Sequence, residues 1–392
     1  MKKLFESIYN WKRGGLSKSL VVCMVILTST SLVWGESHSF ENEEIIGTSM
    51  SVKFECSSDT LATDTYAKVL KEVERLRKIY DYRLPDSELS LLVKKSRGQY
   101  LPVSRELLSV LKLGKAGYKK REGRDNDCGE QVVTVWKKAE STKHLPSYEE
   151  IKAVVKRAES IAKAVMIDEK NMKVAVPSGA NIDLDSLAKG AIIDDLITGM
   201  GKFRGVKGAV VNIGGDVRVG DDQNGTMVSV KDTEGNEVSK LTLKNRAIAT
   251  SGGKYRYYTI AGKKYSHLID MQSGRPVNTH RTVSVISKTA AFADMLATIL
   301  SCYSTAEAIR FTESIPHTEC LIVDASNPRQ VSSGWSAFER SKPTSNSIFG
   351  GTVNKVNIAW RQNDSTRGKR FHRHYTVVWI EDKQGGKVRD LL

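Results

Sequence analysis

Two kinds of apolar pattern share this chain, and together they limit the folds open to it. Before residue 170 the apolar residues recur mainly at helical spacing. After it, short β-like runs are separated by Gly, Asp and Asn. We therefore expect a mixed α/β (α+β) fold in which a sheet-rich body packs against helices. The predicted strands are 45–55, 174–176, 209–213, 227–230, 248–250 and 320–324, and the predicted helices are 61–80, 106–120, 132–139, 148–164, 186–200 and 292–301.

The N-terminus differs from this body. Residues 1–35 resemble a secretory signal, because basic residues precede an apolar stretch at 20–33, and Val33 and Gly35 suit a signal peptidase. An uncleaved membrane anchor is the alternative, although this apolar stretch is short for a spanning helix. We expect an exported protein, periplasmic or facing the periplasm from the inner membrane, whose main domain is residues 36–340.

The C-terminal part also differs from the body. Residues 341–351 are rich in Ser, Gly and Pro and are predicted to form a linker. Residues 352–392 hold two strand-like runs, too little for an independent core. The segment from Tyr375 has the pattern of a short β-hairpin with a Gly-Gly turn. We predict a truncated β-rich extension of unknown role.

The charge and the cysteine content limit the classes of ligand and metal that the chain is expected to bind. The formal net charge is +15, but the basic residues are spread along the chain and are not gathered into a stripe with interleaved aromatics. Nucleic-acid binding therefore has little support, while phosphorylated ligands, anionic lipid or cell-wall polymers fit the charge. The five cysteines form no Cys-x-x-Cys pair and have no nearby His at zinc spacing, so a zinc site is not indicated.

The first chemical motif is Asn-Ile-Asp-Leu-Asp-Ser-Leu-Ala-Lys-Gly at 181–190, where an acidic strand end leads into a helix. Backbone N–H groups at a helix start can hold phosphate, and Lys189 adds a positive charge. An Asp or Ser that only caps the helix is the alternative.

The second motif is the apolar strand at 208–213 that ends in Gly-Gly-Asp at 214–216. Two glycines let the backbone approach a ligand or another strand closely. A tight β-turn carrying an Asp is the alternative. The spacing matches neither the dinucleotide fingerprint nor a P-loop, which excludes a Rossmann or a Walker site.

The third motif places His267 and Asp270 before a turn at Ser273-Gly274, downstream of Ala-Thr-Ser-Gly at 249–252. A histidine at a strand end beside carboxylates can act as a general base. A structural histidine is the alternative.

The fourth motif is Ala-Ala-Phe-Ala-Asp-Met-Leu-Ala-Thr at 290–298. Asp294 and Thr298 are four residues apart on a predicted helix, so their oxygen-bearing side chains share one face. Two hard oxygen ligands suit Mg²⁺, which takes few protein ligands and completes its shell with phosphate oxygens and water. The alternative is an Asp cap with a Thr bonded to the preceding turn.

Together these segments resemble the FAD:protein FMN transferases, also called the ApbE family of flavin transferases. The resemblance covers roughly residues 45–339. No single motif is decisive, but seven in family order are highly specific. They are Gly-Thr-Ser-Met at 47–50, Pro-Asp-Ser-Glu-Leu-Ser at 85–90, Asp-Leu-x-x-Leu-Ala-Lys-Gly at 183–190, Asn-Ile-Gly-Gly-Asp at 212–216, Ala-Thr-Ser-Gly at 249–252, His-Leu-Ile-Asp at 267–270 and Ala-Asp-Met-Leu-Ala-Thr at 293–298.

The resemblance implies an exported, Mg²⁺-dependent enzyme that splits FAD. It implies transfer of FMN onto a Thr or Ser hydroxyl of an exported client protein, with release of AMP. The residue chemistry agrees, because pyrophosphate cleavage needs a cation to offset developing charge and a base to accept the hydroxyl proton. By similarity, the base is His267, the metal ligands are Ser186, Asp294 and Thr298, and the FAD site includes Met50, Tyr82, Asp183, Lys189 and Leu268.

The chain departs from the family pattern on the FAD side. Members commonly read Gly-Ala-Phe-Asp ahead of a tryptophan, where this chain has Gly-Arg-Asp-Asn at 123–126 ahead of Trp136. Val93 stands where members commonly have Asn, and one extra residue follows Tyr82. The metal and base positions are intact, whereas the FAD side of the pocket is changed. We therefore expect altered FAD affinity or an altered balance between transfer and hydrolysis.

Two rival functions use the same residues. An FAD pyrophosphatase would release FMN and AMP to water, and a non-catalytic flavin-binding protein would be favoured if His267 or Asp294 were missing. Both residues are present. The chain has no Asp-x-Gly-x-Thr acceptor motif, so the resemblance implies a separate client protein.

Overall fold

The computed structural model describes residues 35–120, 127–222, 225–252, 257–277, 281–324, 329–339, 355–361 and 375–379. Its centre is an eight-stranded sheet in which every neighbouring pair is antiparallel. In spatial order the strands are β1 (Glu36–Ile45), β2 (Thr48–Cys56), β6 (Lys207–Ile213), β7 (Asp216–Val219), β10 (Arg246–Gly252), β15 (Thr282–Ser287), β16 (Glu319–Val323) and β17 (Gln330–Val331).

Both faces of this sheet are covered, and β10 shows how the sequence divides them. Ala247 and Ala249 join the core on the helix side, whereas Ile248 between them joins a second core on the other side. Strands buried on both faces lose the apolar–polar alternation of a solvent-facing strand. On β6, likewise, Val210 joins the second core and Val211 the core on the helix side.

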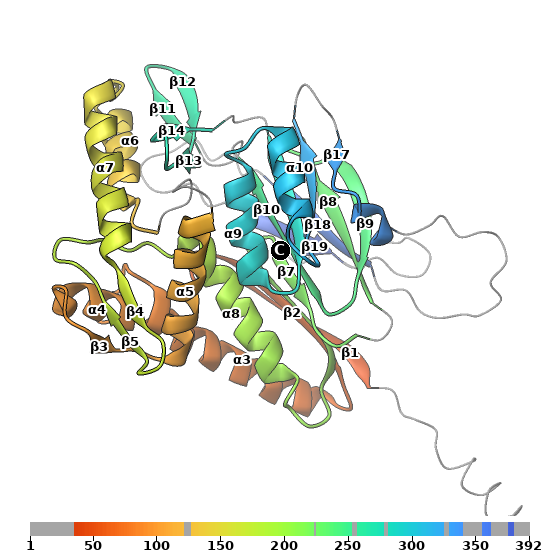
Figure 1. Ribbon diagram of the computed structural model, residues 1–392. Helices are drawn as coiled ribbons and strands as arrows, with labels where there is room; N and C mark the ends of the chain where they lie inside the picture. Colours follow the sequence, from red (N-terminus) through yellow and green to blue (C-terminus); the bar gives the residue numbers. More distant parts are fainter. Residues whose placement is uncertain are drawn as a thin grey trace, which may run out of the picture.

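Helices cover one face (Figure 1). They are α3 (Asp59–Tyr80), α5 (Arg105–Lys120), α8 (Asp185–Met200) and α9 (Ala290–Leu300), with α10 (Thr305–Glu313) beside β16. Nearly the whole of α9 is buried, so it is a core helix rather than an amphipathic surface helix.

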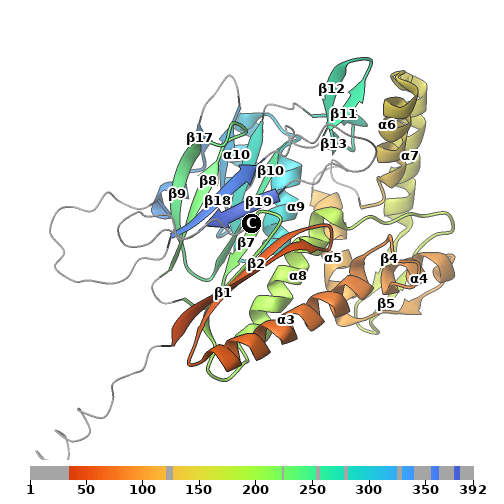
Figure 2. The same ribbon diagram turned by 180° about the vertical axis from the view of Figure 1, so that it is seen from behind.

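A smaller sheet covers the opposite face, seen from behind in Figure 2. Its order is β19 (Tyr375–Trp379), β18 (Lys355–Arg361), β8 (Thr226–Lys231) and β9 (Glu237–Leu243). Valines and leucines of β8 and β9 pack against the main sheet together with Trp335, which begins a short 3₁₀ helix, η2 (Trp335–Ala337). The two C-terminal strands pair with each other antiparallel, and β18 joins β8 in parallel.

A third unit stands at one end of the molecule. It contains α6 (Glu130–Thr142), α7 (Tyr148–Ala164) and two hairpins, β11 (Tyr257–Ile260) with β12 (Lys263–Ser266) and β13 (Ile269–Asp270) with β14 (Arg275–Pro276). Trp136 and Ile269 lie in their shared core. The remaining elements are α4 (Glu88–Ser96) and a small sheet of β3 (Leu101–Pro102), β5 (Lys173–Ala175) and β4 (Met166–Asp168).

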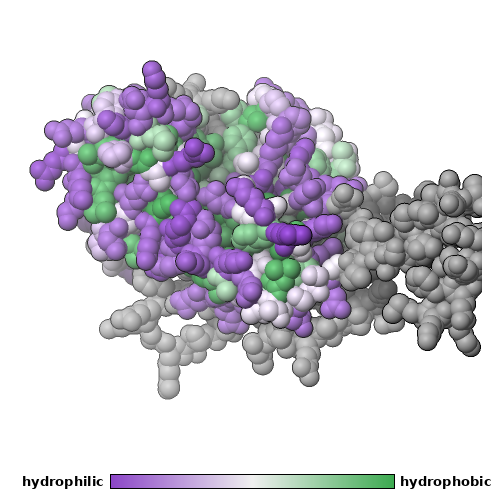
Figure 3. Space-filling model, turned by 90° about the horizontal axis from the view of Figure 1, so that it is seen from below, coloured by the Kyte–Doolittle hydropathy of each residue, from purple (hydrophilic) through white to green (hydrophobic). Residues whose placement is uncertain are grey.

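The predicted fold class is confirmed, and the long elements agree closely. The helix predicted at 148–164 is α7, and the one predicted at 186–200 is α8 with one residue more. The expected signal, the segment 123–126, the linker 341–351 and the Gly-Gly turn of the C-terminal hairpin lie outside the described residues. In the described part, no helix is both long and apolar enough to cross a membrane. On the face in Figure 3, hydrophilic residues predominate and hydrophobic ones form small separate patches.

Candidate functional site

Most of the predicted motifs meet at one end of the main sheet. Met50 near the start of β2 pairs with Ile213 at the end of β6, and the chain turns there into β7 at Asp216. Because β10 runs antiparallel to β7, its last residues reach the same end. Gly252 at the end of β10 pairs with Thr282 at the start of β15. Strand ends from four different parts of the chain therefore lie side by side.

A buried charge cluster occupies the helix side of this end. Lys189 Nζ donates to Asp216 Oδ2 and to Asp294 Oδ2, both at 2.6 Å. The two carboxylate side chains are 4% and 8% exposed, whereas that of Lys189 is 32% exposed. The ammonium group thus reaches two buried carboxylates from the more open side.

Burial and charge shift the protonation equilibria of this cluster. Burial, reinforced by the neighbouring Asp216 carboxylate and only partly offset by Lys189, raises the pKa of Asp294 to about 8. Burial alone would lower the pKa of Lys189, but the two carboxylates outweigh it and raise that pKa. When both carboxylates are ionised, they leave an excess negative charge beside the single ammonium group, and this charge suits a further cation.

The antiparallel packing of α8 and α9 brings these residues together. Ala290 and Ala291, at the start of α9, donate backbone N–H groups to the carboxylate of Asp194 on α8 at 2.8 and 3.0 Å. One turn earlier on α8, Lys189 reaches Asp294. Ser186 precedes Lys189 in the first turn of α8. Because the two helices are antiparallel, Ser186 lies toward the part of α9 that follows Asp294 and carries Thr298. The three predicted metal ligands are thus on facing helices.

Thr298 is linked to the strand end beside it. Its Oγ1 lies 3.1 Å from Ser251 Oγ, in the Ala-Thr-Ser-Gly segment at the end of β10. The helix is capped by Thr289 and by the Asp194 carboxylate, not by Asp294. The alternative reading of Asp294 and Thr298 as a cap and a back-bonded threonine is therefore wrong.

Asp183 and Tyr82 belong to a neighbouring cluster before α8. Asp183 Oδ1 accepts the N–H of Asp185 at 2.8 Å, and Asp185 binds Arg83, whose guanidinium lies over the Tyr82 ring at 5.1 Å. Burial and the Asp185 carboxylate raise the pKa of Asp183 to about 6. The N-cap of α8 is Leu184, which makes no side-chain capping bond, so neither Asp183 nor Ser186 is the cap residue of this helix.

Met50 lies at the turn but its side chain points into the core. It is 2% exposed and packs in the helix-side core. Gly214 N–H donates to the carbonyl of the preceding Ser49 at 2.9 Å, which ties this strand to the Gly-Gly turn. Any contact of Met50 with a ligand at this edge would therefore involve its backbone.

His267 and Leu268 are carried by the insert between β10 and β15. This insert contains both hairpins, and its two ends are the paired residues Gly252 and Thr282. His267 is half-buried between β12 and β13, and Leu268 O accepts the N–H of Val277 at 2.9 Å. The insert therefore begins and ends beside Ser251 and Thr298.

Asp270 has a turn-forming role. Its carboxylate accepts the N–H of Gln272 at 3.0 Å and the hydroxyl of Ser273 at 3.1 Å. Trp136 Nε1 on α6 donates to Gly274 O at 2.8 Å, so a buried hydrogen bond holds the same turn against α6.

The oxygen donors at this end fit a magnesium ion. Within the described residues, no three His, Cys, Asp or Glu side chains are grouped so as to hold a metal. A cation here would be held by the Asp294 carboxylate and by neutral oxygens such as Thr298. Few protein ligands, all of them oxygen, are what Mg²⁺ accepts when phosphate and water complete its shell.

Sequence reasoning missed two functional candidates. Asp216 was noted only as part of the Gly-Gly-Asp motif, yet it is the second carboxylate on Lys189. Gly214 and Gly215 have φ values of 63° and 98°. They form the tight turn after which β7 begins at Asp216. Ser251, the partner of Thr298, lay in a quoted motif but received no role.

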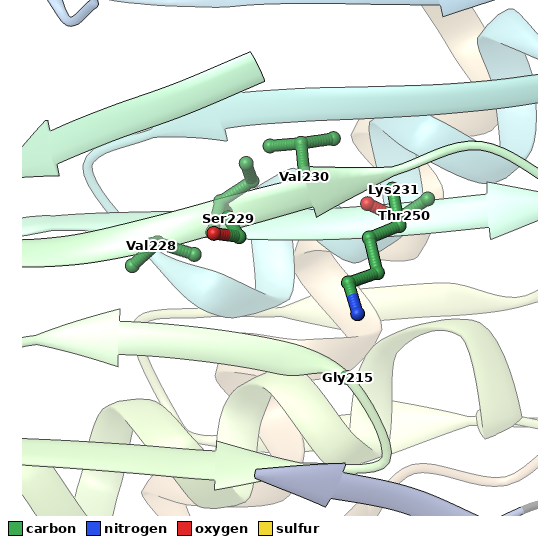
Figure 4. Close-up of a pocket in the computed structure, with 7 residues that line it drawn as sticks. Gly215, Val228, Ser229, Val230, Lys231 and Thr250 are labelled. Carbon is green, nitrogen blue, oxygen red and sulfur yellow. The ribbon is translucent and has the colours of Figure 1, made fainter. Parts of the chain in front are cut away.

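A separate hollow lies on the other face of the main sheet (Figure 4). Thr250 and Ile248 line it from β10, and both alternate with the residues that face α9. Its other lining residues are Gly215, Val228, Ser229, Val230 and Lys231. Since the sheet separates this hollow from Lys189 and Asp294, we do not assign the chemistry to it.

Comparison with known proteins gives consistent matches. The family model described as the ApbE family matches residues 46–322. The FAD:protein FMN transferase of Buchnera aphidicola is 28% identical over 255 residues, covering 62% of this chain and 74% of that protein. The Vibrio cholerae enzyme of the same name is 27% identical over 293 residues, covering 70% and 85%. The crystal structure of the ApbE protein from Thermotoga maritima aligns with a TM-score of 0.68 and 25% identity, covering 78% of this chain and all of that one.

Proposed function

This chain belongs to the ApbE family, and on that basis we propose that it is a transferase that moves FMN from FAD to a client protein. The proposed acceptor is a Thr or Ser hydroxyl, the second product is AMP, and the reaction requires Mg²⁺. The observation that carries the proposal is the Lys189 ammonium group between Asp216 and Asp294, at the sheet end where Thr298 meets Ser251.

The proposed reaction is a substitution at phosphorus. The client's hydroxyl oxygen bonds to the FMN-side phosphorus of FAD, the bond from that phosphorus to the bridging oxygen breaks, and AMP leaves with the bridging oxygen. His267 accepts the hydroxyl proton as the general base. The positive charge of Lys189 offsets charge on the phosphate oxygens.

Ser186, Asp294 and Thr298 are the proposed ligands of the magnesium ion. When bound, the ion neutralises charge on the phosphate oxygens and orients the leaving group. The first turn of α8 also presents backbone N–H groups, which favour an anion at the same place.

We further propose that FAD lies across the two clusters described above. Asp183 and Tyr82 before α8, the backbone of Met50 and Leu268 on the insert would then contact it. The support is that Met50 and the two ends of the insert lie at the sheet end that carries Asp216, and that Asp183 directly precedes the helix that carries Lys189. The replaced segment 123–126 is followed directly by Asp127, whose carbonyl accepts the N–H of Asp183 at 2.8 Å.

The test is an incubation of purified residues 36–392 with FAD, Mg²⁺ and a peptide that bears the acceptor motif Asp-x-Gly-x-Thr. Mass spectrometry of the peptide and chromatography of AMP would follow the two products. We expect FMN on the peptide and an equal amount of AMP, both abolished by a chelator. Free FMN with an unmodified peptide would instead support an FAD pyrophosphatase, and bound FAD without cleavage would support a flavin-binding protein.

We also propose that the protein is exported and acts on an exported client, because residues 1–35 have the pattern of a secretory signal. A fusion of residues 1–60 to a reporter that is active only outside the cytoplasm tests this. Activity of the fusion that is lost when residues 20–33 are deleted is the expected result. An inactive intact fusion would contradict it.

A further inference from the structure

Lys189 already binds one oxygen of the carboxylate that is the proposed charged ligand of a cation. Its Nζ is 2.6 Å from an oxygen of Asp294, the proposed charged ligand of the magnesium ion. Mg²⁺ binds oxygen at about 2.0–2.1 Å and demands regular geometry. An ammonium group and a divalent ion on one carboxylate would repel each other strongly, because the site is buried and little water screens them.

We propose that Lys189 and Mg²⁺ compete for Asp294, and that the pyrophosphate of FAD relieves this competition by drawing Lys189 away, so that FAD and Mg²⁺ bind cooperatively. This inference rests on the proposed function and adds a regulation of the same site. Lys189 then controls the binding of the cation to Asp294 and also contacts phosphate.

The charge balance supports this coupling. Asp216 and Asp294 with Lys189 carry one net negative charge when both carboxylates are ionised. A divalent ion added without a ligand would reverse that sign inside a buried cluster, which is unfavourable. The two phosphate charges of FAD restore the balance, and they offer the ammonium group a new partner on its exposed side.

The positions of the three side chains also allow the exchange. Asp216 starts a strand directly after the Gly-Gly turn and Asp294 lies in the middle of a buried helix, so both carboxylates are held rigidly. Lys189 has a flexible stem and is about one-third exposed. The movable partner is therefore the lysine. Asp216 acts as a positioning residue that keeps the ammonium group near the site when Asp294 binds the ion.

The first arm of the test measures Mg²⁺ affinity by calorimetry without flavin. Lys189→Met removes the competing charge and keeps an unbranched stem, so we expect Mg²⁺ to bind at least about tenfold more tightly than to the wild type. The control is Lys202→Met, which changes an exposed lysine just beyond the same helix and should leave affinity unchanged. Unchanged or weaker Mg²⁺ binding to Lys189→Met would overturn the proposal.

The second arm uses the wild-type protein, so it stands even if the variant does not fold. Saturating FAD should raise Mg²⁺ affinity about 5-fold to 150-fold, the usual range of coupling between sites. Riboflavin, which lacks the pyrophosphate, should not. Equal Mg²⁺ affinity with and without FAD would overturn the proposal even in an active transferase. Coupling without flavin transfer to the peptide would instead overturn only the proposed function.

Discussion

Gly190 on α8 lies so close to Ala291 on α9 that a Cβ atom on the glycine would come within 2.4 Å of the Ala291 backbone. No side chain fits in that space. The contact holds the two helices at the separation at which Lys189, one residue before Gly190, reaches Asp294, three residues after Ala291. The glycine of the Ala-Lys-Gly motif is therefore a packing requirement for the charge cluster.

Gly190→Ala should destabilise the protein by about 1–3 kcal/mol, the usual cost of overpacking a core. Urea unfolding measures this. The control is Gly199→Ala on the same helix, where an added Cβ meets nothing within 4 Å. That variant should gain up to about 1 kcal/mol from helix propensity. Equal stability of the two variants would contradict the close approach of α8 and α9.

Asp294→Asn should abolish Mg²⁺-dependent FAD turnover while the protein stays folded. The amide keeps the shape of the side chain but loses the charge that binds the ion. A metal's contribution of several kcal/mol corresponds to a loss on the order of 100-fold or more. FAD turnover and circular dichroism are measured together. A folded variant with full activity would refute the metal assignment.

Much of the fold could be predicted because its long elements carry local signals. The Ser147 cap and an apolar stripe delimit α7 correctly. The first strand, β1, was missed because its sequence is mostly polar and its residues are largely exposed, as suits an edge strand. The helix α10 was also missed, although Ser304 and Glu307 form a capping box that could have located it.

The candidate site was less predictable, because its contacts join residues that are far apart in the chain. Lys189 is 27 residues from Asp216 and 105 from Asp294, and no local pattern pairs them. Motif order identified the segments. Only the antiparallel packing of α8 and α9, with the Gly-Gly turn between β6 and β7, identified which charges meet.

His267→Ala should reduce FMN transfer to the client peptide by a factor on the order of 100 or more, the usual scale for a general base. FAD binding should change little, because the imidazole acts on the client's proton. Single-turnover transfer and flavin fluorescence separate the two effects. Equal losses of binding and transfer would mark His267 as a residue that positions the flavin.

Restoring the family pattern at 123–126 should tighten FAD binding. Arg124→Ala, Asp125→Phe and Asn126→Asp together replace charge with an aromatic ring that can pack on a flat ligand. One such contact is worth about 1 kcal/mol. Fluorescence titration with Mg²⁺ present measures it, and binding that is unchanged or weaker would show that this segment does not touch FAD.

The last prediction concerns a carboxylate outside the proposed site. Asp195 on α8 is partly buried beside Tyr80 on α3, and burial, together with the charges of Glu106 and Asp194, raises the pKa of Asp195 to about 6. In the unfolded chain this carboxyl has its ordinary pKa near 4. Between these values the folded state binds more protons than the unfolded state, so Asp195 lowers stability as pH rises from about 4 to 6.

Asp195→Asn should therefore stabilise the protein above pH 6 and have little effect at pH 4. The shift corresponds to about 3 kcal/mol without screening, and partial exposure reduces the expected gain to about 1–2 kcal/mol. Urea unfolding of the variant and the wild type between pH 4 and 8 measures the difference. Asp64→Asn, an exposed change on α3, is the control and should give no pH-dependent gain. A gain that is the same at every pH would show that the amide acts through packing, because only a titrating Asp195 makes the difference grow between the two pKa values.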